Sequence, residues 1–210
     1  MSGETFASPT ELAELICGLD RPLLLAFDCD GVLAPIVDHA DDAVLLPGTG
    51  ELLASIAGLS DVHVAVLSGR SLAGLEQFGF GDAIAVAGSY GAERRGVDAE
   101  ELTDEEARLL SLVGERAETA AGRAGEGGWV ERKPGSVVLH LRQADPDRGA
   151  AAARWLLRDV GDAEVHEGSG VIEIMARPMN KGIGLTRLRT EVEPVSYTHL
   201  RAHETERTIS

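Results

Sequence analysis

The stretch that decides the fold runs from Pro22 to Gly31 and reads PLLLAFDCDG. An unbroken apolar run that stops at acidic residues and a glycine is typical of a strand buried on both faces, as strands of parallel sheets are. We therefore predict such a strand over 22–27. Asp28 and Asp30 follow it, and their side chains share one side because residues two apart on a strand point the same way.

Working outward, strands and helices alternate on both sides of this run. The stretch Ser8-Pro9-Thr10-Glu11 has the spacing of a capping box and predicts a short helix that ends at Gly18. Downstream we predict a helix over 51–57, a strand over 62–67, a helix from Leu72 and a strand over 83–87. This order favours a parallel sheet with helices on both faces. The polar turns after the three strands lie where such sheets bind ligands.

The pattern changes after Glu93, where we place a domain boundary. Thr103 begins a second capping box and a long helix, and a glycine-rich stretch follows over 122–128. Next come predicted strands over 129–132 and 136–141, a helix from Pro146, and strands over 163–166 and 171–176. This order predicts a small α+β domain over 94–176, inserted into a first domain that comprises 1–93 and 177–194.

Composition excludes several classes of protein. The 210 residues carry 19 basic and 35 acidic side chains, for a net charge of −16. We therefore expect neither nucleic acid nor an anionic membrane surface as a partner. The first residues lack the pattern of a signal peptide, and no apolar run approaches the ~20 residues of a membrane span. With only Cys17 and Cys29 present, we expect a reduced, cytoplasmic protein.

The last stretch, from Val195 to Ser210, departs from the rest of the chain. It contains no glycine, has no net charge and follows neither apolar periodicity. The string VSYTHLRAHET also resembles the translated read-through of a sequencing adaptor. We therefore expect a non-native tail that packs against nothing, the alternative being a genuine tail that is frayed.

Asp28 and Asp30 are the first candidate functional residues. Two carboxylates that share a site require a cation or a proton, because like charges repel. Gly31 allows a sharp turn whose backbone N–H groups can bind an anion. The alternative is an Asp-rich turn that caps a strand. Cys29 lies between the two acids, and we expect it in the core.

Further motifs carry a family resemblance. Asp28-Cys29-Asp30-Gly31-Val32-Leu33 resembles the first motif of haloacid dehalogenase superfamily phosphatases. Leu67-Ser68-Gly69-Arg70-Ser71 and Gly88-Ser89-Tyr90-Gly91-Ala92-Glu93 make the chain look like the trehalose-6-phosphate phosphatase family. The resemblance continues in the family's order through residues 133–142, 173–178 and 180–182. It implies an α/β fold with a Rossmann-like parallel-sheet core and an inserted α+β cap domain.

The resemblance also implies a mechanism for hydrolysing trehalose 6-phosphate. Asp28 would attack phosphorus and form an aspartyl phosphate, while Asp30 would act as acid and then as base. Ser68 and Lys181 would stabilise the transferring phosphoryl group. Mg2+ would be held by the Asp28 carboxylate and the backbone carbonyl of Asp30. Taken singly, Ser68 could be a helix cap and Lys181 a solvated lysine.

The resemblance also implies that residues of both domains recognise the sugar. These residues are Gly69, Arg70, Tyr90, Glu93, Lys133, His140, Arg142 and Glu173. Polar side chains of both signs suit a small molecule dense in hydroxyls. The alternatives are exposed strand residues for Lys133 and His140, and solvated ion pairs for Arg70 and Glu93.

The chain departs from the family pattern in two places. Tyr90 stands where the family usually has histidine. The family's second acidic motif, a pair of aspartates after Lys181, is not found, because the last aspartate is Asp162. We therefore expect a C-terminally truncated chain with an incomplete metal site. The alternative functions are a phosphatase of sucrose 6-phosphate or mannosyl-3-phosphoglycerate, or a non-catalytic fragment that binds sugar phosphates.

Overall fold

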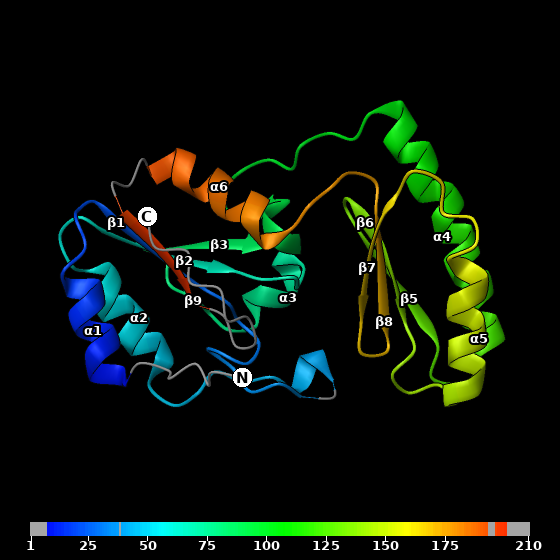
Figure 1. Ribbon diagram of the computed structural model, residues 1–210, viewed down its shortest axis with the longest axis horizontal. Helices are drawn as coiled ribbons and strands as arrows, with labels where there is room; N and C mark the ends of the chain where they lie inside the picture. Colours follow the sequence, from blue (N-terminus) through cyan, green and yellow to red (C-terminus); the bar gives the residue numbers. More distant parts are fainter. Residues whose placement is uncertain (1–7, 38, 193–195, 201–210) are drawn as a thin grey trace, which may run out of the picture.

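The structure, a computed structural model, describes residues 8–37, 39–192 and 196–200. It has two lobes, a core and a cap, each built on its own sheet (Figure 1). The chain crosses from core to cap through residues 95–103 and returns through 176–180. Both connections run along the same side of the molecule in Figure 1. Within the described ranges, no helix combines the length and apolar character that a membrane span requires.

The core sheet has the strand order β4-β3-β2-β1-β9. Strand β1 occupies its interior and runs parallel to β2 from the pair Leu23 and Val62 to the pair Phe27 and Val66. Strand β3 is parallel to β2, whereas the short β4 is antiparallel to β3. The strands are β1 Leu23–Phe27, β2 Val62–Leu67, β3 Ile84–Gly88, β4 Glu93–Arg94 and β9 Ser196–Leu200.

Helices cover both faces of this sheet, as the continuous apolar run of β1 predicts. Leu23 and Leu25 pack on the face that is covered by α1, α2 and α3, whereas Leu24 and Ala26 pack against Leu185 of α6 on the other face. These helices are α1 Pro9–Cys17, α2 Thr49–Ala57, α3 Leu72–Glu76 and α6 Lys181–Val192. Two 3-10 turns, η1 Ala40–Asp42 and η2 Ser89–Gly91, lie in loops of the core.

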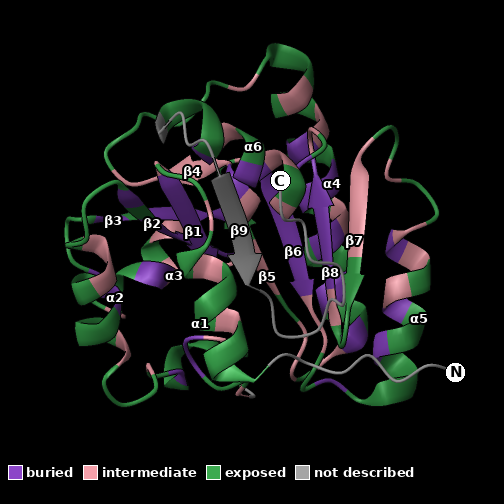
Figure 2. Cartoon of the chain, turned by 60° about the vertical axis from the view of Figure 1, so that its left-hand side comes forward, coloured by how far each residue is buried: buried purple, intermediate pink, exposed green. Residues whose placement is uncertain are grey.

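The cap is an antiparallel sheet in the order β5-β6-β8-β7 with two helices on its outer face (Figure 1). Apolar residues of one sheet face, such as Leu139 and Ile172, pack against α4 and α5 to form a separate core. Figure 2 shows this burial in β6, β8 and the inner sides of the two helices. The elements are α4 Asp104–Ala124, β5 Trp129–Lys133, β6 Ser136–His140, α5 Pro146–Leu156, β7 Glu164–Gly168 and β8 Val171–Met175.

The C-terminal stretch corrects one expectation. Residues 196–200 form β9, which pairs with β1 in parallel register from Leu23 opposite Ser196 to Phe27 opposite Leu200. The expectation that this part of the tail packs against nothing is therefore wrong. The backbone groups on the second side of β1 need partners, and an added strand supplies them. Val195 and residues 201–210 lie outside the described residues.

The core sheet also extends one residue past the boundary that we placed at Glu93. Arg94 pairs with Ala87 of β3 across the antiparallel ladder, so it belongs to the core. The expected helix caps occur as Ser8, Thr103 and Asp145, each of which accepts a backbone N–H in the first turn of its helix.

Candidate active site

The candidate site lies where the three parallel strands β1, β2 and β3 end. Because parallel strands end at one edge, the turns that begin at Asp28, Ser68 and Ser89 lie together there. Helix α6 begins beside them with Lys181. The cap sheet faces this edge of the core (Figure 1). The structure therefore brings the sequence motifs of both lobes to one place.

Asp28 is buried at the end of β1 and is ion-paired with Lys181. Its Oδ1 accepts the backbone N–H of Cys29 at 2.9 Å, and its Oδ2 accepts from Lys181 Nζ. Cys29 itself is fully buried, and burial, followed by the charge of Asp30, raises the pKa of its thiol to about 12. Cys29 is thus a neutral core residue, as expected. The charge of the buried Asp28 carboxylate is balanced by Lys181.

Asp30 is held by both arms of the Arg70 guanidinium. Arg70 Nε donates to Oδ2 at 2.8 Å and Arg70 Nη2 donates to Oδ1 at 2.7 Å. The same guanidinium donates to the carbonyl of Ala40 at 2.8 Å and lies over the ring of Phe78. Its hydrogen bond to Asp30 raises the pKa of Arg70. Arg70 therefore orients Asp30, and the pair is partly buried rather than freely solvated.

Ser68 is buried beside Asp28, at the tip of the neighbouring strand. Its Oγ accepts the backbone N–H of Arg70 at 3.1 Å, which leaves its own O–H able to donate. The cap of helix α3 is Ser71, not Ser68. The helix-cap alternative for Ser68 is therefore wrong.

Glu93 stabilises the turn after β3 through two hydrogen bonds. One of its carboxylate oxygens accepts from Ser89 Oγ at 2.5 Å and from the backbone N–H of Leu72 at 3.3 Å. Ser89 and Tyr90 both have positive φ, 48° and 57°, a backbone conformation that is uncommon for residues other than glycine. Glu93 thus stabilises a strained turn that presents Tyr90 to the cap.

Lys133 and Glu173 of the cap contact the core directly. Lys133 Nζ donates to Glu173 Oε1 and to the backbone carbonyl of Gly69, both at 3.1 Å. Ser136 Oγ donates to the same Glu173 oxygen at 2.7 Å. The side chains of Lys133 and Glu173 are only 7% and 6% exposed. The alternative of an exposed strand lysine is therefore wrong, and the pair lies between the two lobes.

Tyr90 completes this contact from the core side. Its ring packs so closely on Gly69 that a Cβ there would lie 2.9 Å from Tyr90 Cζ. Its ring meets the ring of His166 edge-on with centroids 5.4 Å apart. Burial, followed by the charge of Glu173, raises the pKa of Tyr90 to about 12. The phenol therefore remains neutral at physiological pH.

His140 and Arg142 lie at the other end of β6 from Ser136 and Lys133, at and just after the last residue of the strand. His140 Nε2 bonds Glu131 at 3.0 Å, and its ring stacks on Trp129 with centroids 3.8 Å apart. This hydrogen bond lowers the pKa of Glu131. Arg142 Nη1 donates to the carbonyl of Val37 in the core at 3.3 Å. His140 is therefore held by Glu131 and Trp129. Arg142 forms a second contact between the cap and the core.

Some polar and aromatic residues of this face were not among the sequence candidates, and they include Trp129, Glu131 and Ser136. Register places them on the same face of the cap sheet as Lys133 and Glu173. The signal that could have found Trp129 and Glu131 is their even spacing, four and two residues before Lys133, because alternate strand residues share a face.

The carboxylate of Asp28 and the backbone carbonyl of Asp30 offer oxygen ligands of the kind that Mg2+ prefers. Mg2+ in proteins is commonly held by one or two carboxylates together with water and substrate phosphate oxygens. Within the described ranges, no three His, Cys, Asp or Glu side chains are grouped as metal ligands. The donor chemistry therefore fits Mg2+ at the Asp28 side of the site, with few ligands from the described residues.

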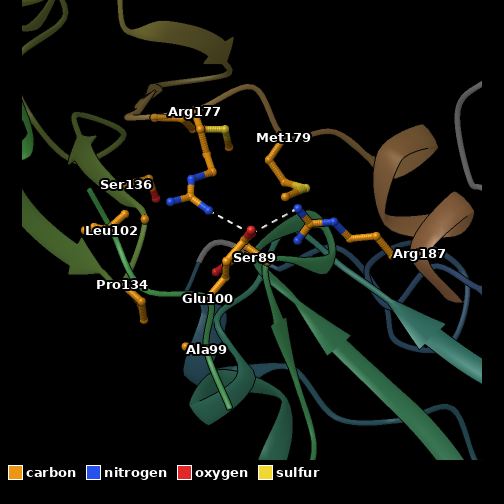
Figure 3. Close-up of a pocket in the computed structure, with 12 residues that line it drawn as sticks. Ser89, Ala99, Glu100, Leu102, Pro134, Ser136, Arg177, Met179 and Arg187 are labelled. Carbon is orange, nitrogen blue, oxygen red and sulfur yellow. Dashed lines mark hydrogen bonds and ion pairs between the residues drawn. The ribbon is translucent and has the colours of Figure 1, made fainter. Parts of the chain in front are cut away.

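A separate small pocket lies at the hinge between the lobes (Figure 3). Glu100 is paired there with Arg177 at 2.7 Å and with Arg187 at 3.2 Å. Arg177 also holds Glu106, at the start of α4, through two hydrogen bonds of 2.8 and 2.6 Å. These contacts join the two connecting segments to α4 and α6, so the pocket belongs to the hinge.

The chain is similar to several trehalose-phosphate phosphatases. The chain is 29% identical over 178 residues to trehalose-6-phosphate phosphatase of Escherichia coli (strain K12), covering 82% of this chain and 65% of that protein. It is 34% identical over 179 residues to a trehalose-phosphate phosphatase of Mycobacterium marinum, covering 79% of this chain and 45% of that protein.

A solved structure of the C-terminal domain of Candida albicans trehalose-6-phosphate phosphatase superposes with a TM-score of 0.63 at 25% identity, covering 79% of this chain and 61% of that one. The chain thus spans less than two thirds of the length of these relatives. The trehalose-phosphatase family profile matches residues 26–196, which include both lobes and every candidate side chain. On this match the chain belongs to the trehalose-phosphatase family.

Proposed function

We propose that this protein is a Mg2+-dependent phosphatase that hydrolyses trehalose 6-phosphate to trehalose and inorganic phosphate. The observation that carries the proposal is the buried ion pair of Asp28 and Lys181 at the strand tips, with Asp30 and Ser68 beside it. A carboxylate nucleophile, an acid–base group and a fixed cation are what phosphoryl transfer through a covalent intermediate requires.

In the first half-reaction, Asp28 attacks phosphorus while the bond to the sugar oxygen breaks, and an aspartyl phosphate forms. Asp30 protonates the departing sugar oxygen. To do so, its carboxyl group has to give up at least one of its two hydrogen bonds from Arg70. In the second half-reaction, Asp30 accepts a proton from the water that attacks phosphorus, while the bond between phosphorus and Asp28 breaks, which releases phosphate and the free carboxylate. Lys181 and the hydroxyl of Ser68 offset the charge on the phosphoryl oxygens.

The metal would be held by the carboxylate of Asp28 and the backbone carbonyl of Asp30. When bound, Mg2+ supplies positive charge that reduces the repulsion between the nucleophile and the phosphate. Lys181 already supplies one such charge to Asp28.

The cap supplies recognition of the sugar in this proposal. Lys133 and Glu173 form a buried ion pair at the junction of the lobes, and the ring of Tyr90 lies nearby against Gly69 of the second motif. Hydroxyl groups of the sugar can form hydrogen bonds with these polar side chains, because a hydroxyl group both donates and accepts. Arg142 and His140 lie farther from the strand tips, where a larger substrate would extend.

The test is a substrate panel measured with the parent protein and with Asp28→Asn. We expect Mg2+-dependent phosphate release from trehalose 6-phosphate, and a loss of at least about a thousandfold in the variant, because the amide cannot form the phosphoenzyme. Asp20→Asn, at an exposed position in the loop before β1, is the matched control and should retain parental turnover. Turnover of Asp28→Asn within tenfold of the parent would contradict the assignment of the nucleophile.

The panel also decides between the alternatives. A preference for sucrose 6-phosphate or mannosyl-3-phosphoglycerate would replace the substrate but keep the mechanism. Binding of sugar phosphates without release of phosphate would favour the non-catalytic role.

A further inference from the structure

Trp129 is a large aromatic residue that the fold leaves half exposed, with 50% of its surface accessible. It begins strand β5, directly opposite His140 of β6. The two rings are stacked almost parallel, at 4° and 3.8 Å between centroids. Cross-strand aromatic pairs stabilise a sheet, but that purpose does not require an indole to remain open to solvent.

The face on which Trp129 lies is settled by strand register. Trp129, Glu131 and Lys133 alternate along β5 and share one face, because side chains of a strand alternate. Residues of the opposite face, Val130 among them, pack into the cap core beneath α4 and α5. Since Lys133 on the first face reaches Gly69 of the core, Trp129 lies on the cap surface that looks toward the active site.

The chemistry around Trp129 suits a sugar ring. The flat indole offers an apolar surface, and the Glu131 carboxylate and His140 imidazole lie beside it and are bonded to each other at 3.0 Å. An apolar platform bordered by a few polar groups is the usual composition of a small-molecule subsite. The C–H face of a pyranose would lie on the aromatic pair and its hydroxyl groups would reach the polar border.

The position of Trp129 along β5 indicates which ring of the substrate would contact it. Trp129 and Lys133 are the two ends of β5, which places their backbones ~13 Å apart at the usual rise per residue. Lys133 is at the junction with Gly69, near the phosphate end of the site. A hexose held there would leave Trp129 free, whereas a second linked ring would extend toward it.

We infer that Trp129, stacked on His140, is a specificity residue that binds the sugar ring remote from the phosphate. This inference rests on the proposed function and identifies its substrates as phosphorylated sugars of two rings rather than one.

The first test uses fluorescence and needs no turnover. The sequence has two tryptophans, and the second, Trp155, lies on α5 between α4 arginines, away from the site. In a Trp155→Phe protein, titration with trehalose, which carries no phosphate, should change Trp129 emission in a saturable way. Glucose at the same concentrations should change it much less. An emission that trehalose leaves unchanged would overturn the inference.

The second test compares substrates in Trp129→Ala and Trp129→Phe. We expect kcat/KM for trehalose 6-phosphate to fall about tenfold in the alanine variant, the factor that ~1.4 kcal/mol represents, mainly through KM. Activity on glucose 6-phosphate and on a small aryl phosphate should be unchanged, and phenylalanine should restore part of the loss. Equal losses on all substrates, or none on trehalose 6-phosphate, would contradict the inference. Absence of phosphatase activity on every substrate would instead refute the proposed function, while the fluorescence titration would still decide the role of Trp129.

Discussion

At the scale of single residues, Tyr90 connects the core to the cap. It stands at positive φ in a turn braced by Glu93, its ring covers Gly69, and the ring also meets His166 of the cap edge-on. The ring contact couples the position of the turn to that of the cap sheet. Tyr90 thus links the turn after β3 to the cap.

The raised pKa of Tyr90 leads to a prediction about stability at alkaline pH. The folded pKa of about 12 exceeds the ordinary value of 10, so the contribution is complete below pH ~10 and is lost as pH rises toward 12. The loss should be at most ~3 kcal/mol, at ~1.4 kcal/mol per pKa unit. Tyr90→Phe should lack this decline, because phenylalanine has no hydroxyl group to ionise.

Urea unfolding of the two proteins between pH 8 and 12 measures this difference in pH dependence. Cys29, whose pKa burial also raises to about 12, is present in both proteins and cancels in the difference. Parallel stability curves for parent and variant above pH 10 would show that Tyr90 is not protected as the structure indicates.

At the scale of elements, α6 is placed by two glycines. Gly91 of the turn after β3 has φ of 97°, and a Cβ on it would lie 2.5 Å from the Cα of Gly184 in α6. A Cβ on Gly184 would lie 2.2 Å from the carbonyl oxygen of Tyr90. This close approach brings the first turn of α6, and with it Lys181, next to Asp28.

We predict that Gly184→Ala displaces α6 and costs ~2 kcal/mol or more of stability, because backbone atoms meet the new methyl group. Phosphatase activity should fall with the displacement of Lys181. Gly50→Ala in α2 is the matched control, since nothing lies within 4 Å of its Cβ position. Thermal melting of both variants checks this, and the control should be as stable as the parent or slightly more so. A Gly184→Ala protein with parental stability would refute the close contact.

The hinge also depends on single charged contacts. The pKa of Glu106 is lowered from 4.5 to about 2. The main cause is its hydrogen bonding to Arg177, and the second is the hydrogen bond from the backbone N–H of Thr103. A carboxylate with a lowered folded pKa stabilises the protein above its unfolded pKa, and the contribution disappears as pH falls through the folded value. We therefore predict that Glu106→Gln reduces the dependence of melting temperature on pH between about 4.5 and 2.

Glu105→Gln, at the exposed neighbouring position, serves as the control and should keep the parental slope. The measurement is the melting temperature of the three proteins at several pH values in this window. If Glu106→Gln and Glu105→Gln behave alike, Arg177 does not hold Glu106 in solution.

At the scale of the whole molecule, the cap is an insertion with its own interior. Its buried residues form one cluster, separate from those on the two faces of the core sheet. The chain enters and leaves it once, through adjacent connections tied together by Arg177. An independent hydrophobic core with few covalent crossings is the usual definition of a folding domain.

We predict that a fragment of residues 100–178 folds alone, with a cooperative thermal transition and an α+β circular dichroism spectrum. Leu139→Ala within the fragment removes a fully buried side chain and should cost ~2–5 kcal/mol, enough to abolish the transition in so small a domain. A parent fragment that melts without cooperativity would mean that the cap requires the core.

Much of the fold is determined locally and could be predicted from the sequence. The apolar run of β1 requires burial on both faces, and the caps at Ser8, Thr103 and Asp145 begin their helices where expected. The strand tips that carry Asp28 and Ser68 follow from the order of strands and helices, because parallel strands end at one edge. Each of these features depends on residues close together in the chain.

Only the tertiary structure decided the partners of the site residues. Arg70 lies 40 residues from Asp30, and Lys181 lies 153 residues from Asp28, so neither pair follows from local spacing. The pairing of β9 with β1 belongs to the same class, because the 196–200 segment lacks a periodicity that would predict a strand. Sequence patterns determine which residues reach an edge or a face, whereas long-range packing of strands, α6 and the cap determines which of them meet.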